Sequence, residues 1–393
     1  MNIFPPPHRL KSIMTLSLPI MGGMISQNIF NLVDTAMVGQ LGTAALAAVG
    51  IASLVNFFCQ ASLLGVSSGV QAIASRRLGE NRKSEAASPL NAGLLIVLLL
   101  GVLLTILLMW LIPIFFPLIN PDREVIELGQ EYLLWRVLAI TFVAMNYAFR
   151  GYWNAVNLSK IYMSTLISMH ILNIFLNYAL IFGNFGFPEL GVKGAAIGTS
   201  LSMLFGTLLY FVMAFRLARC NGFLKYLPKV KSIFNLLKVS LPASTQQIFF
   251  SAGLTALFYI IGLIGTEETA AARVLINIML VCILPGMGLG LGAASLVGQA
   301  LGRQDREDAF LWGMEVVKIA LVFISSVGFL LVLFPNYILS VFLVDPITRN
   351  LAILPLQFTG LFIGLDAAGL VFMNALLGAS DSRRVMLISI FSQ

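Results

Sequence analysis

Residues 86–121 read AASPLNAGLLIVLLLGVLLTILLMWLIPIFFPLINP, a stretch of the 393-residue chain without one acidic or basic side chain. The hydrocarbon core of a bilayer is about 30 Å thick, and a helix crosses it with roughly 20 apolar residues. The stretch exceeds that length and lacks the alternation of apolar and polar residues that marks a transmembrane β-strand. Because no water reaches the bilayer core, the backbone must satisfy its own hydrogen bonds, so we predict a membrane-spanning helix.

The whole chain has the same character: 59% of its residues are hydrophobic, 10% are charged, and its mean hydropathy is +0.93. Soluble domains are about 25% charged, so the composition excludes a soluble globule. Three cysteines exclude a disulfide framework. We predict an all-α integral membrane protein with an eleventh span beginning near Val385. The ten complete spans are expected near residues 12–38, 44–70, 90–115, 126–150, 161–183, 194–216, 237–263, 270–297, 310–334 and 350–376.

Lysine and arginine are concentrated on one side of the predicted topology. The N-terminus and the loops after even-numbered spans hold most of the 24, namely Arg9, Lys11, Arg76, Arg77, Arg82, Lys83, Arg150, Lys160, Arg216, Arg219, Lys225, Lys229, Lys231, Lys238, Arg303, Arg306, Arg383 and Arg384. Those elsewhere are Arg123, Arg136, Lys193, Arg273, Lys318 and Arg349. Because cytoplasmic loops carry an excess of basic residues, we expect a multi-pass protein of the cell inner membrane with a cytoplasmic N-terminus. The net charge of +7 then reflects contact with anionic lipid, and no nucleic acid is expected to bind.

The second half of the chain repeats the first. Four pairs of matches share an offset of 223 residues (242 − 19): Leu18-Pro19 with Leu241-Pro242, Leu78-Gly79 with Leu301-Gly302, Gly65 with Gly288, and Gly69 with Gly292. An even number of spans per repeat returns the chain to its starting side. The repeats are therefore parallel copies related by an axis along the membrane normal, a common transporter design with substrate held between the halves.

The repeat also predicts the domain organisation. We assign residues 1–220 to an N-terminal six-helix bundle, 221–238 to a cytoplasmic linker, and 239–393 to a C-terminal bundle. The first unit ends near Ala214, so the offset places the end of the second near position 437 (214 + 223), beyond Gln393. We therefore expect the C-terminal bundle to be incomplete, holding spans 7–10 and the start of span 11.

Several motifs together resemble the multidrug and toxic compound extrusion (MATE) family of cation-coupled efflux pumps. They are NLVDTAMVG at 31–39, SRRLG at 75–79 with its copy GQALG at 298–302, NIFLNY at 173–178, PELGVKGAA at 188–196 and DAA at 366–368. The resemblance covers nearly the whole chain. It implies two parallel six-helix bundles on a twelve-span plan, here truncated within span 11. It also implies secondary active antiport of H+ or Na+ against organic, often cationic, drugs.

Two aspartates lie within predicted spans, where a carboxylate costs about 2.5–3.5 kcal/mol on insertion scales and usually serves a function. Asp34 shares one helical face with Gln27 and Asn31, so this polar stripe should face a water-filled cleft. Asp34 also fits a position at the outer interface, where charge is tolerated. Asp366 lies deep in span 10, and a structural bond to a neighbouring helix is its alternative.

The resemblance places Asn173 and Asn177 beside Asp34, with Thr199 nearby. Their alternative role is interhelical hydrogen bonding, worth about 0.6 kcal/mol on average. Two departures leave the coupling ion open: many family members carry a carboxylate at the position of Asn177, and the sodium-coupled branch has a glutamate near Phe250. Either aspartate could hold Na+. We expect no catalytic residue, no other metal and no cofactor.

The proposed chemistry is competition for a desolvated carboxylate. Such a group can take a proton, or can coordinate Na+ together with amide and hydroxyl oxygens. A cationic drug arriving from the cytoplasm competes for the same negative charge, and alternating access between the halves exchanges the two. Small-molecule drugs and the lipid bilayer are the expected partners of a monomer.

Three rival interpretations remain. A lipid-linked saccharide flippase of the same superfamily should have a strongly basic cavity, whereas the deep charges here are mainly acidic. A membrane enzyme would need a cluster of catalytic groups that the sequence lacks. A non-functional truncated fragment is the third. Two further patterns have structural interpretations: the glycines at 286–292 predict close helix packing rather than a nucleotide loop, and Glu315 should pair with Lys318 at i, i+3.

Overall fold

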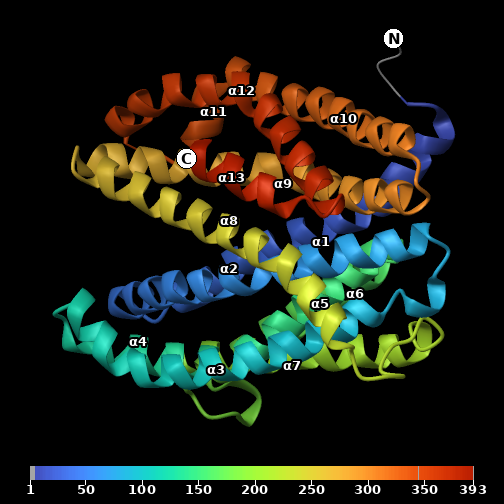
Figure 1. Cartoon of the computed structure of the whole chain (residues 1–393). Coiled ribbons are helices and arrows are strands. Elements are labelled where there is room, and N and C mark those ends of the chain that lie inside the picture. The colour runs from blue at the N-terminus through green and yellow to red at the C-terminus, as the bar shows by residue number, and fades with distance from the viewer. Residues whose placement is uncertain (1–4, 344, 393) are drawn as a thin grey trace.

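The computed structural model describes residues 5–343 and 345–392, which are almost entirely helical and contain no strand (Figure 1). The α-helices are α1 (Pro7–Gly39), α2 (Thr43–Gly79), α3 (Ser88–Ile119), α4 (Arg123–Leu138), α5 (Ile140–Ala155), α6 (Ser159–Phe182), α7 (Gly191–Leu217), α8 (Val230–Gly262), α9 (Thr266–Gly302), α10 (Arg306–Leu333), α11 (Pro335–Ser340), α12 (Pro346–Gly378) and α13 (Ser382–Ser392). Two short 3-10 helices are η1 (Lys83–Glu85) and η2 (Asn184–Gly186).

The helices confirm the predicted all-α membrane class. Within the described residues, nine helices are long and apolar enough to cross a membrane. A tenth span consists of α4 and α5, which meet at Ala139 with a bend of 46°. Helix α13 occupies the position of the predicted eleventh span. Large side chains such as Trp110 and Leu118 on α3 are more than two-thirds exposed, as lipid-facing residues of a membrane helix are expected to be.

Aspartates at equivalent places of the repeat begin two of these helices. The Asp122 side chain accepts a hydrogen bond from the backbone N–H of Glu124, and Asp345 accepts from the N–H of Thr348 at 2.8 Å. Such N-caps satisfy donors that have no partner within the helix. The backbone and hydroxyl hydrogen bonds from Thr348 hold the pKa of Asp345 below its ordinary value.

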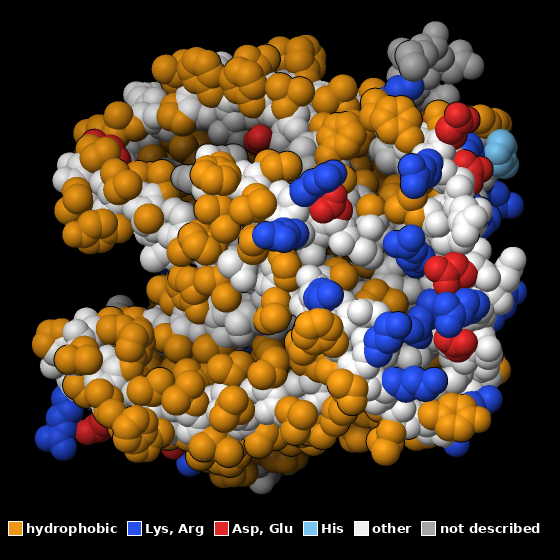
Figure 2. Space-filling model, in the orientation of Figure 1, with side chains coloured by type: hydrophobic (Ala, Val, Ile, Leu, Met, Phe, Trp, Pro, Cys, Tyr) orange, Lys and Arg blue, Asp and Glu red, His pale blue; other side chains and the backbone are white. Residues whose placement is uncertain are grey.

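The helices form two groups that touch along only part of their length. Helix α2 packs on α4 and α5, α6 packs on α1 and α7, and α12 packs on α9 and α10. The groups α1–α7 and α8–α13 meet where α2 contacts α8 and α9, and where α1 contacts α9. Beyond this crossing they diverge (Figure 1). Figure 2 shows the resulting cleft at one end, while most lysine and arginine side chains on this face lie toward the other end.

Glycines allow the two groups to cross closely, and they do so symmetrically. A Cβ added to Gly69 of α2 would collide with the Ser240 hydroxyl of α8, and one added to Gly292 of α9 would collide with the Ser17 hydroxyl of α1. These pairs are related by the same 223-residue offset (240 − 17). The crossing confirms the interpretation of the glycine repeat as close packing.

One basic residue differs from its expected surroundings. Arg150, assigned from the sequence to a cytoplasmic loop, lies within α5, and its Nε donates to the Ser67 hydroxyl at 3.1 Å. Arg136 lies inside the span predicted at 126–150, within α4 and one turn before the bend at Ala139. The count of basic residues did not separate loop positions from positions inside a span, because a long side chain can lie within a bundle when polar groups surround it.

Candidate functional site

Asp34 on α1 and Asn177 on α6 form the centre of the candidate site. The Asn177 amide donates a hydrogen bond of 2.5 Å to the Asp34 carboxylate. Further along the same helix pair, Phe30 stacks on His170 with ring centroids 4.8 Å apart, and the Ser26 hydroxyl lies 2.8 Å from Nδ1 of that histidine. These contacts align α1 with α6 and hold the carboxylate beside the asparagine.

Asn173 and Asn177 carry buried polar atoms without partners. The two side chains are 1% and 0% exposed, and they lie one turn apart on α6. Among the described residues, no group hydrogen-bonds to Oδ1 or Nδ2 of Asn173 or to Oδ1 of Asn177. Native structures leave few buried polar atoms unsatisfied. Such a group of carbonyl oxygens beside a carboxylate is suited to binding a hard cation or a proton-carrying water.

Thr199 is close to this cluster. It is buried on α7, and its hydroxyl donates to the carbonyl of Ala195 at 2.8 Å. The preceding residue, Gly198, lies directly beside Asn177, since a Cβ added there would collide with Oδ1 of that amide. The Thr199 oxygen keeps lone pairs that a cation could use.

Arg136 belongs to the same region and was not identified from the sequence. The positive charge of this α4 residue acts on Asp34 and on buried Tyr132, although no ion-pair contact forms with Asp34. Its Nε and Nη1 atoms are buried, and no described residue accepts a hydrogen bond from them. One signal was available: Arg136 is a basic residue inside the span predicted at 126–150.

The other predicted residues form no side-chain hydrogen bond with this cluster in the described part of the chain. Gln27 and Asn31 are exposed along α1, and no described residue hydrogen-bonds to their side chains. Asp366 is exposed on α12, in the other group of helices, and forms no ion pair or hydrogen bond with a described residue. The two aspartates therefore belong to different helix groups, and no hydrogen bond joins them. No group of three His, Cys, Asp or Glu side chains suited to a metal ion occurs among the residues that the structure describes.

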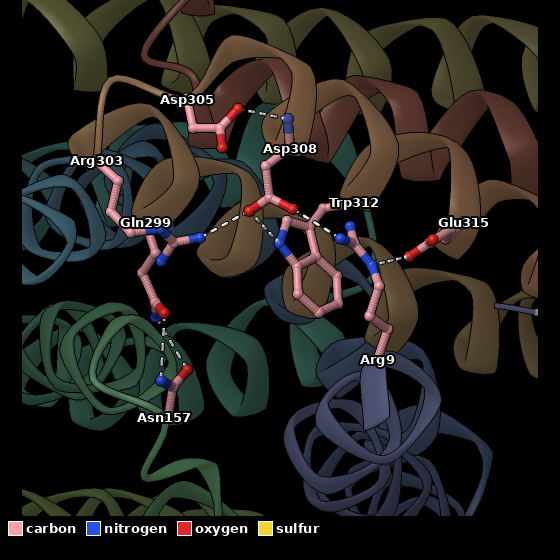
Figure 3. A network of polar contacts seen from close by, with 8 residues as sticks. All are labelled: Arg9, Asn157, Gln299, Arg303, Asp305, Asp308, Trp312 and Glu315. Atoms are coloured by element: carbon pink, nitrogen blue, oxygen red, sulfur yellow. Dashed lines mark hydrogen bonds and ion pairs between the residues drawn. The ribbon is translucent and has the colours of Figure 1, made fainter. Parts of the chain in front are cut away.

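Polar contacts join the two helix groups near the end of α9, and Figure 3 shows those between Gln299 and Asn157. The Gln299 amide of α9 donates to the Ala155 carbonyl and to Oδ1 of Asn157, both at 3.0 Å. Nearby, the Gln71 amide donates to the Leu291 carbonyl at 2.7 Å, and Ser295 donates to the Asn154 carbonyl at 3.0 Å. Each bond links α2, or the end of α5, to α9.

Glu315 takes part in this region in a way that corrects the predicted pair with Lys318. Its carboxylate binds Nε of Arg9 at 2.5 Å, and no ion pair with Lys318 occurs among the described residues. The i, i+3 spacing made a local pair geometrically available, but the arginine at the start of α1 brings a guanidinium with several donors to the same carboxylate.

The MatE family profile matches residues 19–179 and 242–393, one segment in each helix group. The chain belongs to the MatE family. It is accordingly a multi-pass membrane transporter and not an enzyme. The two matched segments correspond to the two copies of the internal repeat, and the family match confirms the resemblance derived from the motifs.

Several MatE relatives align with almost the entire chain. A Thermotoga maritima protein described as probable multidrug resistance protein NorM is 28% identical over 391 residues, which cover 98% of this chain and 83% of the relative. Multidrug resistance protein PmpM of Pseudomonas aeruginosa is 25% identical, with 98% and 81% covered.

A solved structure described as the outward-facing conformation of a multidrug resistance MATE family transporter of the MOP superfamily has a TM-score of 0.89 to this chain. It is 25% identical, and the match covers 98% of this chain and 85% of that one. A second, a MOP superfamily transporter from Pyrococcus furiosus, has a TM-score of 0.87 and 25% identity, with the same two shares covered. The chain thus resembles these transporters in the arrangement of its helices as well as in its sequence motifs. This arrangement is consistent with the twelve-span plan.

Proposed function

We propose that this chain is a secondary active multidrug efflux antiporter, which exchanges H+ or Na+ for organic, often cationic, drugs by alternating access. The names of its MatE relatives support the class of cargo. The observation that carries the coupling chemistry is the Asp34–Asn177 hydrogen bond beside unpartnered amide atoms of Asn173 and Asn177.

The site suits an ion that replaces missing hydrogen-bond partners. Na+ would receive oxygens from Asp34, from the two asparagine amides and from Thr199, an oxygen-only set of the kind that hard cations prefer. A proton on Asp34 would neutralise the carboxylate and turn it into a donor to one of the amide oxygens. Both ions remove the negative charge that attracts a cationic drug, and this exclusion couples the two fluxes.

Arg136 gives the site a resident positive charge. When Asp34 is ionised and no ion is bound, the guanidinium compensates part of its charge within the low-dielectric bundle. The negative potential available to a cationic drug is therefore smaller than that of a lone carboxylate. We infer that Arg136 limits how strongly such drugs bind and favours drugs that carry an acceptor group for its free N–H donors.

The orientation follows from the cleft and the charges. The cleft opens at the end away from most lysine and arginine side chains on the face in Figure 2. If basic residues face the cytoplasm, the cleft opens to the outside of the cell inner membrane and the N-terminus is cytoplasmic. This is the arrangement in which an incoming ion can reach Asp34.

A lipid-linked saccharide flippase is the second candidate, and Arg136 is the observation that favours it, because pyrophosphate would satisfy the unpartnered donors. One arginine beside a carboxylate is a weak site for a highly charged headgroup. The antiporter therefore remains the better-supported function.

Transport by the purified chain in proteoliposomes tests the proposal. Ethidium movement should accelerate under an imposed Na+ or pH gradient, and the effective gradient identifies the ion. Fluorescently labelled lipid-linked saccharide should not change leaflets at the same protein density. Gradient-independent ethidium traces identical to those of protein-free vesicles would refute the antiporter, and saccharide movement would instead support the flippase.

A further inference from the structure

Arg9, at the start of α1, joins the two helix groups through three side chains of α10 (Figure 3). Its Nη1 donates to Asp308 at 2.7 Å, its Nε donates to Glu315 at 2.5 Å, and its guanidinium carbon lies 3.8 Å from the ring centroid of Trp312. We refer to Arg9, Asp308, Trp312 and Glu315 as the Arg9 clamp. Its arginine comes from one group of helices and the other three residues come from the other group.

The α10 half of the clamp is arranged by its own contacts. Asp308, Trp312 and Glu315 follow one another at i, i+4 and i+7 on a single helix face. Asp308 also accepts hydrogen bonds from Arg303 at 2.8 Å and from the Trp312 indole at 3.0 Å. The hydrogen bond from the Trp312 indole to Asp308 fixes the ring next to the Arg9 guanidinium. The α10 side chains are therefore already oriented to bind Arg9.

Burial separates the clamp from the other ion pairs at this end. The side chains of Arg9, Asp308 and Glu315 are 13%, 21% and 14% exposed. Arg82 also pairs with two acids, Glu80 and Glu85, but its side chain is 53% exposed and all three residues belong to α1–α7 or its loops. Exposed pairs contribute little, whereas removing one partner from a shielded pair leaves charges uncompensated.

The clamp lies on the side opposite the cleft, so its contacts depend on how the two groups are oriented. Alternating access rocks one bundle against the other. Closing the cleft pivots the groups about the glycine crossing and separates the start of α1 from α10. That movement must break both ion pairs and the cation–π contact, and it exposes two acids that had shared one guanidinium.

We propose that the Arg9 clamp is the contact that holds the two bundles together on the closed side and sets the population of the cleft-open state. The proposal rests on the proposed alternating access. It assigns Arg9 a conformational role, separate from the ion and drug chemistry at Asp34. Because conformation can be measured without a transported drug, failure of the clamp and failure of the antiporter are distinguishable.

Electron–electron distance measurements across the cleft test the clamp. Spin labels would be attached to Arg123→Cys, where α4 begins, and Tyr337→Cys on α11, with Cys59, Cys220 and Cys282 replaced by serine in the otherwise full chain in nanodiscs. The two labels thus lie in different helix groups, one on α4 and one on α11. Arg9→Gln should lower the ratio of the long-distance to the short-distance population by roughly tenfold.

Matched variants make the result specific. Glu315→Gln should shift the distribution in the same direction, the double variant with Arg9→Gln should shift it by less than the sum, and Arg9→Lys should retain most of the long-distance population. Arg82→Gln removes two ion pairs at the same end within one bundle and should leave the distribution unchanged. A distribution unaffected by Arg9→Gln would overturn the clamp, as would a loss of thermal stability without a distance shift or an equal response to Arg82→Gln.

Discussion

Gly79 of α2 lies against the backbone carbonyl of Gln299 on α9, so that no side chain separates the two helices where they cross on the closed side. The repeat supplies the reciprocal contact, because Gly302 lies against the carbonyl of Arg76. The two halves of the chain thus contact each other backbone to backbone, at positions related by the internal repeat. A Cβ at either glycine would push the bundles apart.

Gly79→Ala should therefore destabilise the chain, by about 1–3 kcal/mol, the usual cost of overpacking. The midpoint of thermal unfolding in detergent is the measurement. Gly50→Ala on the same helix is the control, because a Cβ at Gly50 meets no heavy atom within 4 Å. Equal midpoints for the two variants would contradict the close crossing.

Asn173→Leu should separate stability from transport. The Asn173 amide has no partner among the described residues, so replacing it with an apolar side chain of similar size should leave stability unchanged or raise it slightly. If the amide supplies an oxygen to the coupling ion, ion-driven ethidium transport should fall at least tenfold.

The control for this variant is Asn374→Leu on α12. Asn374 is also buried, but its amide donates to the Leu370 carbonyl of its own helix at 2.8 Å. Transport should survive there. Full ion-driven transport by Asn173→Leu would remove this residue from the site, and an equal loss in both variants would show a general effect of losing a buried amide.

Arg136→Gln should strengthen the binding of a cationic drug. Removing a positive charge that acts on Asp34 increases the negative potential, and at an effective dielectric of about 20 a nearby charge changes affinity by roughly tenfold or more. Fluorescence titration with ethidium measures this directly. Arg123→Gln, on the same helix with a side chain 91% exposed, should bind ethidium like the parent, and weaker binding by Arg136→Gln would contradict the inferred role.

The helices could be predicted from the sequence because the bilayer imposes a length on every span. Charge-free runs such as 86–121 are long enough to cross the bilayer core, and they therefore indicated the spans directly. The span predicted at 126–150 is bent at Ala139 and forms two helices, α4 and α5. The bend was not predicted, because both helices belong to one apolar segment and differ only in direction. The glycine crossing was also foreseeable, because the repeat placed small residues at equivalent positions in both halves.

The polar contacts were harder to predict, because they depend on which helices become neighbours. Asn177 was placed beside Asp34 by resemblance and not by spacing, and the structure brings the two together. Glu315 had a plausible local partner in Lys318, three residues away, yet its partner is Arg9, 306 positions distant in the chain. Arg136 was visible as an intramembrane charge, but nothing in its local sequence indicated that it acts on Asp34.

The account depends most on one claim, that the coupling ion and a cationic drug compete for the charge of Asp34. Ethidium binding to the purified chain, titrated at several pH values and Na+ concentrations, tests it most directly. The apparent dissociation constant should rise as the coupling ion is added to the parent and to Asp122→Asn, whose helix-capping position tolerates asparagine. In Asp34→Asn, ethidium should bind more weakly and show no dependence on the ion. An unchanged ion dependence in Asp34→Asn, or the absence of competition in the parent, would contradict the account.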